Sequence, residues 1–158
     1  MKSVKPADLE RQTRLDPAVR FTLLTGPDEA TMEAVATRLI GLAGKEAERL
    51  DLTGSQLSQD PSLLAAEAAS MSPFSPARII KLQLSGGGDD SLAAVEALLA
   101  AETAINPVVA TGASVTAKSK LVKLVEGSDY AVAAICYQPD RRALVGIAMA
   151  AAQGQGLR

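Results

Sequence analysis

Two short stretches of the chain have the sequence context in which many α/β proteins bind phosphate groups. In the first, over residues 24–32, an apolar run, a Gly26–Pro27 turn and a helical pattern follow one another. A Walker A loop has the spacing G-x-x-x-x-G-K-[S/T], because its amides surround the phosphates and its lysine reaches the terminal groups. Here Pro27 lacks an amide, and Asp28 and Glu29 place negative charge where the anion would lie. We therefore expect no nucleotide at this turn.

The second stretch, GASVTAKS over residues 112–119, fits the Walker A spacing except that Ala117 replaces the second glycine. Alanine resists the positive φ that glycine supplies, and the stretch follows the fourth expected strand instead of the first. Lys118, Lys120 and Lys123 are explained more simply as the solvated face of a following helix. A small nucleotide-binding α/β enzyme that uses residues 112–119 remains one alternative function.

Other catalytic chemistry is limited by the composition. The 158 residues include no histidine, which excludes histidine metal sites and histidine-based triads. Cys136 is the single cysteine, so it forms no intrachain disulfide, and we expect it in the core of a protein from a reducing compartment. Asp89 and Asp90 lie in a glycine-rich turn and do not form an acid–base couple. The sequence thus indicates no catalytic, cofactor-binding or metal-ligating residue.

The most distinctive stretch is SMSPFSPARIIKLQL over residues 70–84, in which two prolines bracket one phenylalanine. Pro73 and Pro76 have a fixed φ and no N–H, so a preceding helix must end and the loop must be stiff. Phe74 is one of only two phenylalanines in the chain. The residues alone leave two interpretations open: Phe74 folds back against the end of the sheet, or it anchors a partner protein.

Charge and hydropathy favour a cytoplasmic protein without affinity for membranes. The formal net charge is −2, which gives no strong field toward nucleic acid or a membrane surface. No apolar run is long enough to span a bilayer, and the N-terminus lacks the apolar region of a signal peptide.

Short apolar runs alternate with helical patterns along the chain, which predicts a three-layer α/β domain around a mostly parallel five-stranded sheet. We expect strands at residues 21–25, 48–52, 78–84, 106–111 and 129–137. We expect helices at residues 30–43 with Asp28 as N-cap, from Asp60 to Pro73, and at residues 91–103, 117–126 and 140–153.

This pattern divides the chain into a lead-in, a domain and a final part. Residues 1–20 are a polar, locally basic lead-in, and residues 21–138 form the α/β domain. The helical pattern within residues 139–158 is apolar around much of its circumference, so it needs covering on more than one side. We expect these residues to begin a following helical domain of a longer protein.

Three segments in this order resemble the N-terminal domain of the delta subunit of the bacterial DNA polymerase III clamp loader. They are FTLLTGPDE, AASMSPFSPARIIKLQL and NPVVATGASVTAKSKLVKLVE, and the resemblance covers roughly residues 20–150. It implies an AAA+/P-loop-like fold with a degenerate phosphate loop, no cofactor, and no ATP binding or hydrolysis. The chain would be a non-catalytic subunit of the DNA polymerase III holoenzyme.

The resemblance also implies a binding site. The family binds the beta sliding clamp through an apolar wedge, which corresponds here to Met71, Ser72, Pro73 and Phe74, and helps to open the ring during DNA replication. Phe74 matches the aromatic residue of the wedge, whereas Pro73 stands where relatives often have leucine, and Met71 is the candidate to compensate. Other clamp-loader subunits would bind through the later part of the protein, and DNA only indirectly within the complex. A purely structural assembly subunit, with the final apolar helix as its only functional surface, is the remaining alternative.

Overall fold

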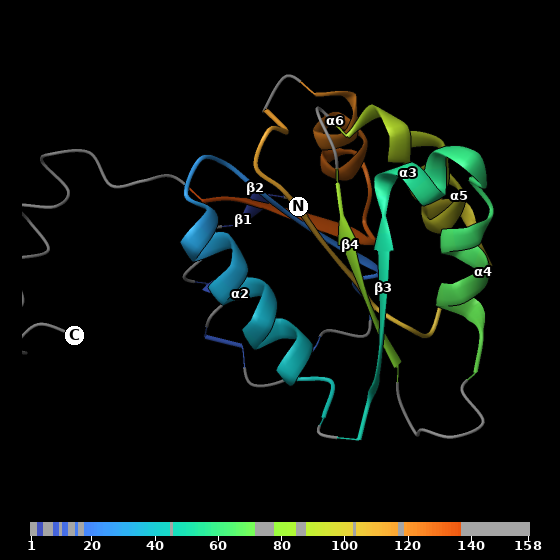
Figure 1. The fold of residues 1–158 in the computed structure, drawn as a ribbon, viewed down its shortest axis with the longest axis horizontal. Helices are drawn as coiled ribbons and strands as arrows, with labels where there is room; N and C mark the ends of the chain where they lie inside the picture. The colour runs from blue at the N-terminus through green and yellow to red at the C-terminus, as the bar shows by residue number, and fades with distance from the viewer. Residues whose placement is uncertain are drawn as a thin grey trace, which may run out of the picture.

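The computed structural model describes residues 3–4, 8–9, 11–12, 15, 18–44, 46–71, 78–84, 88–102, 104–116 and 119–136. Within them a six-stranded sheet has the order β1-β6-β2-β5-β4-β3, and every pair of neighbouring strands is parallel (Figure 1). The elements are β1 (Ser3–Val4), β2 (Phe21–Thr25), α2 (Glu29–Gly41), β3 (Glu48–Thr53), α3 (Gly54–Gln59), α4 (Leu63–Ala69), β4 (Arg78–Gln83), the 3₁₀-helix η1 (Asp89–Ser91), α5 (Leu92–Ala100), β5 (Val108–Gly112), α6 (Lys120–Glu126) and β6 (Ala131–Ile135).

Helices cover both faces of the sheet. Figure 1 shows α2 on one side of the strands and α3 to α6 on the other. Successive strand residues point to opposite faces, so Leu23 of β2 packs toward α3–α6 while Leu24 packs toward α2. Because both faces are buried, the central strands are continuous apolar runs, which confirms the predicted three-layer α/β fold.

The predicted strands are all present, and one more strand joins them. β1 pairs with β6 at the edge of the sheet, with Ser3 opposite Ala133. This two-residue strand falls in the segment that we expected to be only a lead-in. Leu9, from the same segment, is also buried in the α2-side core, so part of residues 1–20 belongs to the domain.

Helix positions differ from the predictions mainly between β3 and β4. An unpredicted helix, α3, begins directly after Thr53, whose side chain accepts a hydrogen bond from the backbone N–H of Gln56. The prediction that Asp60 caps the next helix is wrong: α4 begins at Leu63, and Asp60 accepts hydrogen bonds from the backbone and hydroxyl of Ser62 in a turn. The Asp28 cap of α2 is confirmed, since Asp28 Oδ1 accepts from the N–H of Thr31 at 3.1 Å.

The proposed domain boundary at residue 138 and the helix expected over residues 140–153 lie outside the described residues. Cys136, the last described residue, is fully buried, as we predicted.

Candidate functional site

The carboxyl edge of the sheet, where parallel α/β proteins commonly bind ligands, is closed at the first strand–helix turn. Gly26 has φ +109°, and a side chain there would collide with the backbone of Cys136. The N–H of Asp28 donates to the carbonyl of Cys136 at 2.9 Å, and the N–H of Cys136 donates to Thr25 at 2.6 Å. These bonds tie the turn to the end of β6 and occupy amides that an anion would need.

The carboxylate at this turn is also engaged. The hydroxyl and the backbone N–H of Thr31 both donate to Asp28, and these bonds hold the pKa of that carboxyl below its usual range. An ionised aspartate at the start of α2 suits the helix dipole and repels phosphate. The geometry therefore favours a helix cap over an anion site.

A small polar pocket of about 180 Å³ lies beside the Walker-like stretch. Ligand pockets usually measure about 300–1,000 Å³, so this one is smaller than a nucleotide requires. Glu29 and Glu33 contribute negative charge to its wall, together with Gln83, Thr111 and Ser114. Ser119 serves as the N-cap of α6, where its hydroxyl accepts from the N–H of Leu121. Ala117 and Lys118 lie outside the described residues.

The opposite, amino edge of the sheet carries Met71, the one residue of the predicted wedge that the structure describes. Met71 follows the last turn of α4 and is 83% exposed, the most exposed large apolar side chain among the described residues. Ser72, Pro73 and Phe74 lie outside the described residues, so the structure does not decide between the two interpretations of Phe74. It does describe both ends of this loop, at Ser70–Met71 and at Arg78.

A single arginine joins these two ends. Nη1 of Arg78 donates to Ser70 Oγ at 2.7 Å and to Glu67 Oε1 at 2.6 Å. Its Nη2 and Nε donate to Glu48 Oε1 at 2.6 and 3.1 Å. The side chain is only 16% exposed. Arg78 therefore ties the first residue of β4 to the end of α4 and to the neighbouring strand β3.

The positive charge of Arg78 is stabilised by the two glutamates that it contacts. The hydrogen bond that Arg78 donates to Glu48 is the largest cause that raises the pKa of the guanidinium above its usual range, and the charges of Glu48 and Glu67 add to it. Glu48 and Arg78 are also directly opposed residues in the β3–β4 register. The stem of the loop thus rests on a partly buried network of ion pairs.

A second brace comes from the segment before β5. The side-chain amide of Asn106, which is 5% exposed, donates to the carbonyls of Glu67 at 2.8 Å and Ser70 at 2.7 Å. The backbone N–H groups of Ile105 and Asn106 both donate to the carbonyl of Ala68 at 2.9 Å. These four bonds satisfy the last carbonyls of α4 and fix the position from which Met71 leaves the helix.

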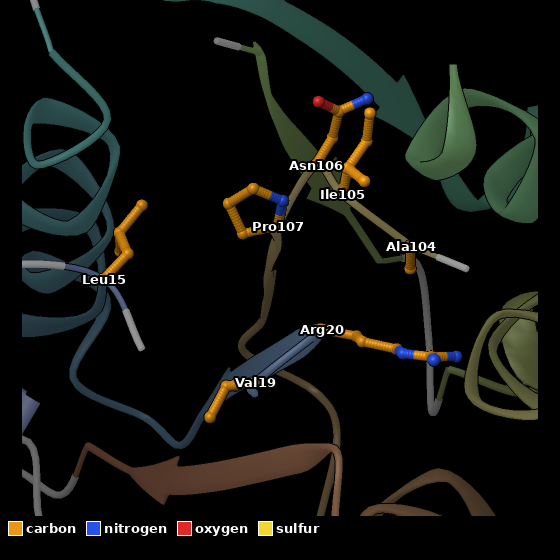
Figure 2. Close-up of a pocket in the computed structure, with 7 residues that line it drawn as sticks. All are labelled: Leu15, Val19, Arg20, Ala104, Ile105, Asn106 and Pro107. Atoms are coloured by element: carbon orange, nitrogen blue, oxygen red, sulfur yellow. The ribbon is translucent and has the colours of Figure 1, made fainter. Parts of the chain in front are cut away.

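A wider, mainly apolar pocket of about 420 Å³ opens on the same edge (Figure 2). Its lining comprises Leu15, Val19, Arg20, Ala104, Ile105, Asn106 and Pro107. Arg20 is turned away from Leu15, as Figure 2 shows, and its Nη1 donates to the carbonyls of Leu98 and Ala101 at the end of α5. Its guanidinium also stacks on the ring of Tyr130, 4.5 Å from the centroid.

No protein-family model and no curated protein sequence matches this chain. Among the described residues, no helix has the length and apolar character needed to cross a membrane, and no cluster of three or more acidic or cysteine side chains could hold a metal ion.

The residues that brace the loop were not singled out from the sequence. Arg78 is a charged residue at the start of an otherwise apolar strand, and Asn106 is a polar residue just before Pro107 and another apolar strand. A polar residue in such a position suggests that its side chain makes hydrogen bonds near the start of the strand. Their partners lie 8 to 39 residues away in the chain, so no local pattern reveals the network.

Proposed function

We propose that this protein is a clamp-loader subunit that binds the beta sliding clamp of DNA polymerase III through the apolar loop at residues 71–74. Binding would help to open the ring for loading onto DNA during replication. The protein would act in the cytoplasm as a non-catalytic member of the polymerase complex, and its later part would join the other loader subunits.

The observation that carries the proposal is the braced loop stem with Met71 exposed beside it. An apolar side chain gains roughly 1.5–3 kcal/mol when it leaves water for a pocket. A loop loses entropy when it is ordered on binding, and this cost falls if its ends are already fixed. Here Arg78 and Asn106 fix the ends, and Pro73 and Pro76 restrict the backbone between them. Such a loop is suited to presenting apolar anchors to a partner.

The carboxyl edge supports a role without ATP. The Gly26 turn uses the amides of Asp28 and Cys136 in internal bonds, and the pocket near Thr111 is small and partly acidic. The parallel sheet with β2 at an interior position agrees with the AAA+-type fold that the resemblance implies. Together these features favour a domain that retains the architecture of a nucleotide-binding protein and has turned to protein binding.

The direct test is the affinity of the chain for the purified beta clamp, measured by surface plasmon resonance. We expect Phe74→Ala to weaken binding by about 30-fold or more, as loss of a central aromatic anchor does. Ser114→Ala, at the exposed carboxyl edge, serves as the control and should bind as the wild type does. Circular dichroism should show unchanged thermal unfolding for both variants. An unaltered affinity of Phe74→Ala would reject the proposal.

A further inference from the structure

Exposed large apolar side chains gather along the amino edge of the sheet. Among the described residues they are Met71, Ile105 and Tyr130, with exposed fractions of 83%, 53% and 46%. They precede β4, β5 and β6, and because all these strands are parallel their starts lie along one edge. No comparable side chain is exposed at the carboxyl edge within the described part of the chain.

A loop of four residues is too small to form a stable interface by itself. An aromatic side chain buries roughly 150–250 Å², whereas a stable interface buries about 800 Å² on each partner. A partner that receives the 71–74 loop must therefore contact further surface around it. The nearest candidates for this further surface are the residues that are hydrogen-bonded to the end of α4.

Ile105 is attached to that end directly. Its backbone N–H donates to the carbonyl of Ala68, three residues before Met71, and the next residue, Asn106, holds the carbonyl of Ser70. The two exposed side chains therefore project from one hydrogen-bonded support. Met71 and Ile105 are thus held in the same hydrogen-bonded region of the amino edge.

The pocket beside Ile105 suits an apolar occupant. Leu15, Val19, Ala104 and Pro107 supply most of its wall (Figure 2). Its one charged residue, Arg20, is engaged with the carbonyls of α5 and with the ring of Tyr130. The pocket thus offers apolar surface, and its arginine is already engaged and does not favour an anionic ligand. Its volume of about 420 Å³ accommodates protein side chains.

We infer that the partner of the 71–74 loop also seats an apolar segment over Ile105 and this pocket, so that Ile105 is a second anchor of the same interface. The inference rests on the proposed function and extends it from a single loop to a continuous surface. The occupant is the clamp itself, through apolar side chains adjacent to the site that receives the loop.

The test measures clamp affinity by surface plasmon resonance for Ile105→Asp, Ile105→Leu and Phe74→Ala in the 158-residue chain. We expect Ile105→Asp to weaken binding by at least about tenfold, because a charge would be buried against apolar surface. Ile105→Leu keeps the apolar volume and should bind within about twofold of the wild type. Ala113→Asp places the same charge at the exposed carboxyl edge and serves as the control, with unchanged affinity.

The outcomes separate this inference from the proposed function. If Phe74→Ala loses binding while Ile105→Asp binds as the wild type does, the second anchor is rejected and the proposed function stands. If the wild type does not bind the clamp, both are rejected. Sedimentation velocity without clamp provides the remaining check: a dimer that Ile105→Asp converts to a monomer would identify a second copy as the occupant and overturn the inference.

Discussion

Arg78 shows how one side chain can join the two ends of a loop. A planar guanidinium presents several donors in a fixed arrangement, and here these donors reach a carboxylate on β3 and a carboxylate and a hydroxyl at the end of α4. A lysine could keep the charge, but it could not satisfy Glu48, Glu67 and Ser70 in the same geometry. The contribution of Arg78 therefore lies in its shape as much as in its charge.

We expect Arg78→Gln to lower the free energy of unfolding by about 2 kcal/mol, because it leaves two partly buried glutamates without their cation. Arg78→Lys should cost less stability. Urea unfolding followed by circular dichroism measures both effects. Arg49→Gln, which breaks an exposed ion pair between Arg49 and Asp51 within β3, is the control and should change stability by less than about 0.5 kcal/mol. Equal effects of Arg78→Gln and Arg49→Gln would contradict a structural role for the network.

Ser91, unlike Arg78, is a buried polar residue whose side chain lacks a hydrogen-bond partner among the described residues. Its hydroxyl is fully buried at the start of α5. The side chain also does not cap the helix, although its position would permit a cap. Burying an unsatisfied hydroxyl is unfavourable, so this serine stabilises the domain less than an apolar residue of similar size would.

Ser91→Ala is therefore expected to raise the free energy of unfolding by about 1 kcal/mol. Ser119→Ala gives a matched comparison, because that serine does cap α6 through the N–H of Leu121 and its loss should cost about 1 kcal/mol. Chemical denaturation of the two variants would show shifts of opposite sign. A loss of stability in Ser91→Ala would mean that the hydroxyl has a partner.

At the scale of the elements, the stability of α2 is coupled to pH through its cap. The folded-state pKa of Asp28 lies below the unfolded value of about 3.9. A carboxyl with a lowered pKa contributes stability that is fully present above the unfolded pKa and is lost as the pH falls through the folded one. The contribution of this cap should therefore disappear on acidification below about pH 4.

Asp28→Asn tests this coupling, because asparagine keeps an acceptor for the N–H of Thr31 but cannot ionise. We expect the wild type to be more stable than Asp28→Asn near neutral pH, with the difference shrinking between about pH 5 and pH 3. Urea unfolding at several pH values measures the difference. Thr31→Val removes the hydroxyl donor and should weaken the pH dependence. A difference that stays constant across this range would refute the assignment.

The sequence predicted elements well where one local signal acts alone. The strand at Phe21–Thr25 is a short apolar run bounded by a turn, and Asp28 directly precedes a helical period. Around α3 two signals compete, because Thr53-Gly54 resembles a strand end although Thr53 and Gln56 have the spacing of a capping box. Asp60–Pro61 resembles a helix start, yet the side chain of Asp60 is used by Ser62 in a turn.

The site was predicted less completely than the fold, for a physical reason. Pro73 and Phe74 are visible in sequence because proline restricts the backbone locally and phenylalanine is rare in this chain. Arg78 and Asn106 act through contacts with Glu48 on β3 and with Ser70 at the end of α4, which only the folded chain brings close to them. Exposure of Ile105 likewise depends on the full fold, since isoleucine in an apolar segment is usually buried.

At the scale of the whole molecule, the two edges of the sheet differ in what they expose. The carboxyl edge holds the Gly26 turn, which is tied to Cys136, while the amino edge bears Met71, Ile105 and the larger apolar pocket. A sheet with parallel strands separates these edges by the length of its strands. Protein binding at the amino edge can therefore develop without altering the turn where related architectures bind nucleotides.

This arrangement predicts that deletion of residues 140–158 leaves clamp binding intact. Both hydrophobic clusters, all six described strands and both braces of the loop lie within residues 3–136. Surface plasmon resonance should give the shortened chain the affinity of the full one, and Phe74→Ala should weaken both equally. If the shortened chain unfolds like the wild type but no longer binds, the final segment is the functional surface and the protein is a structural assembly subunit.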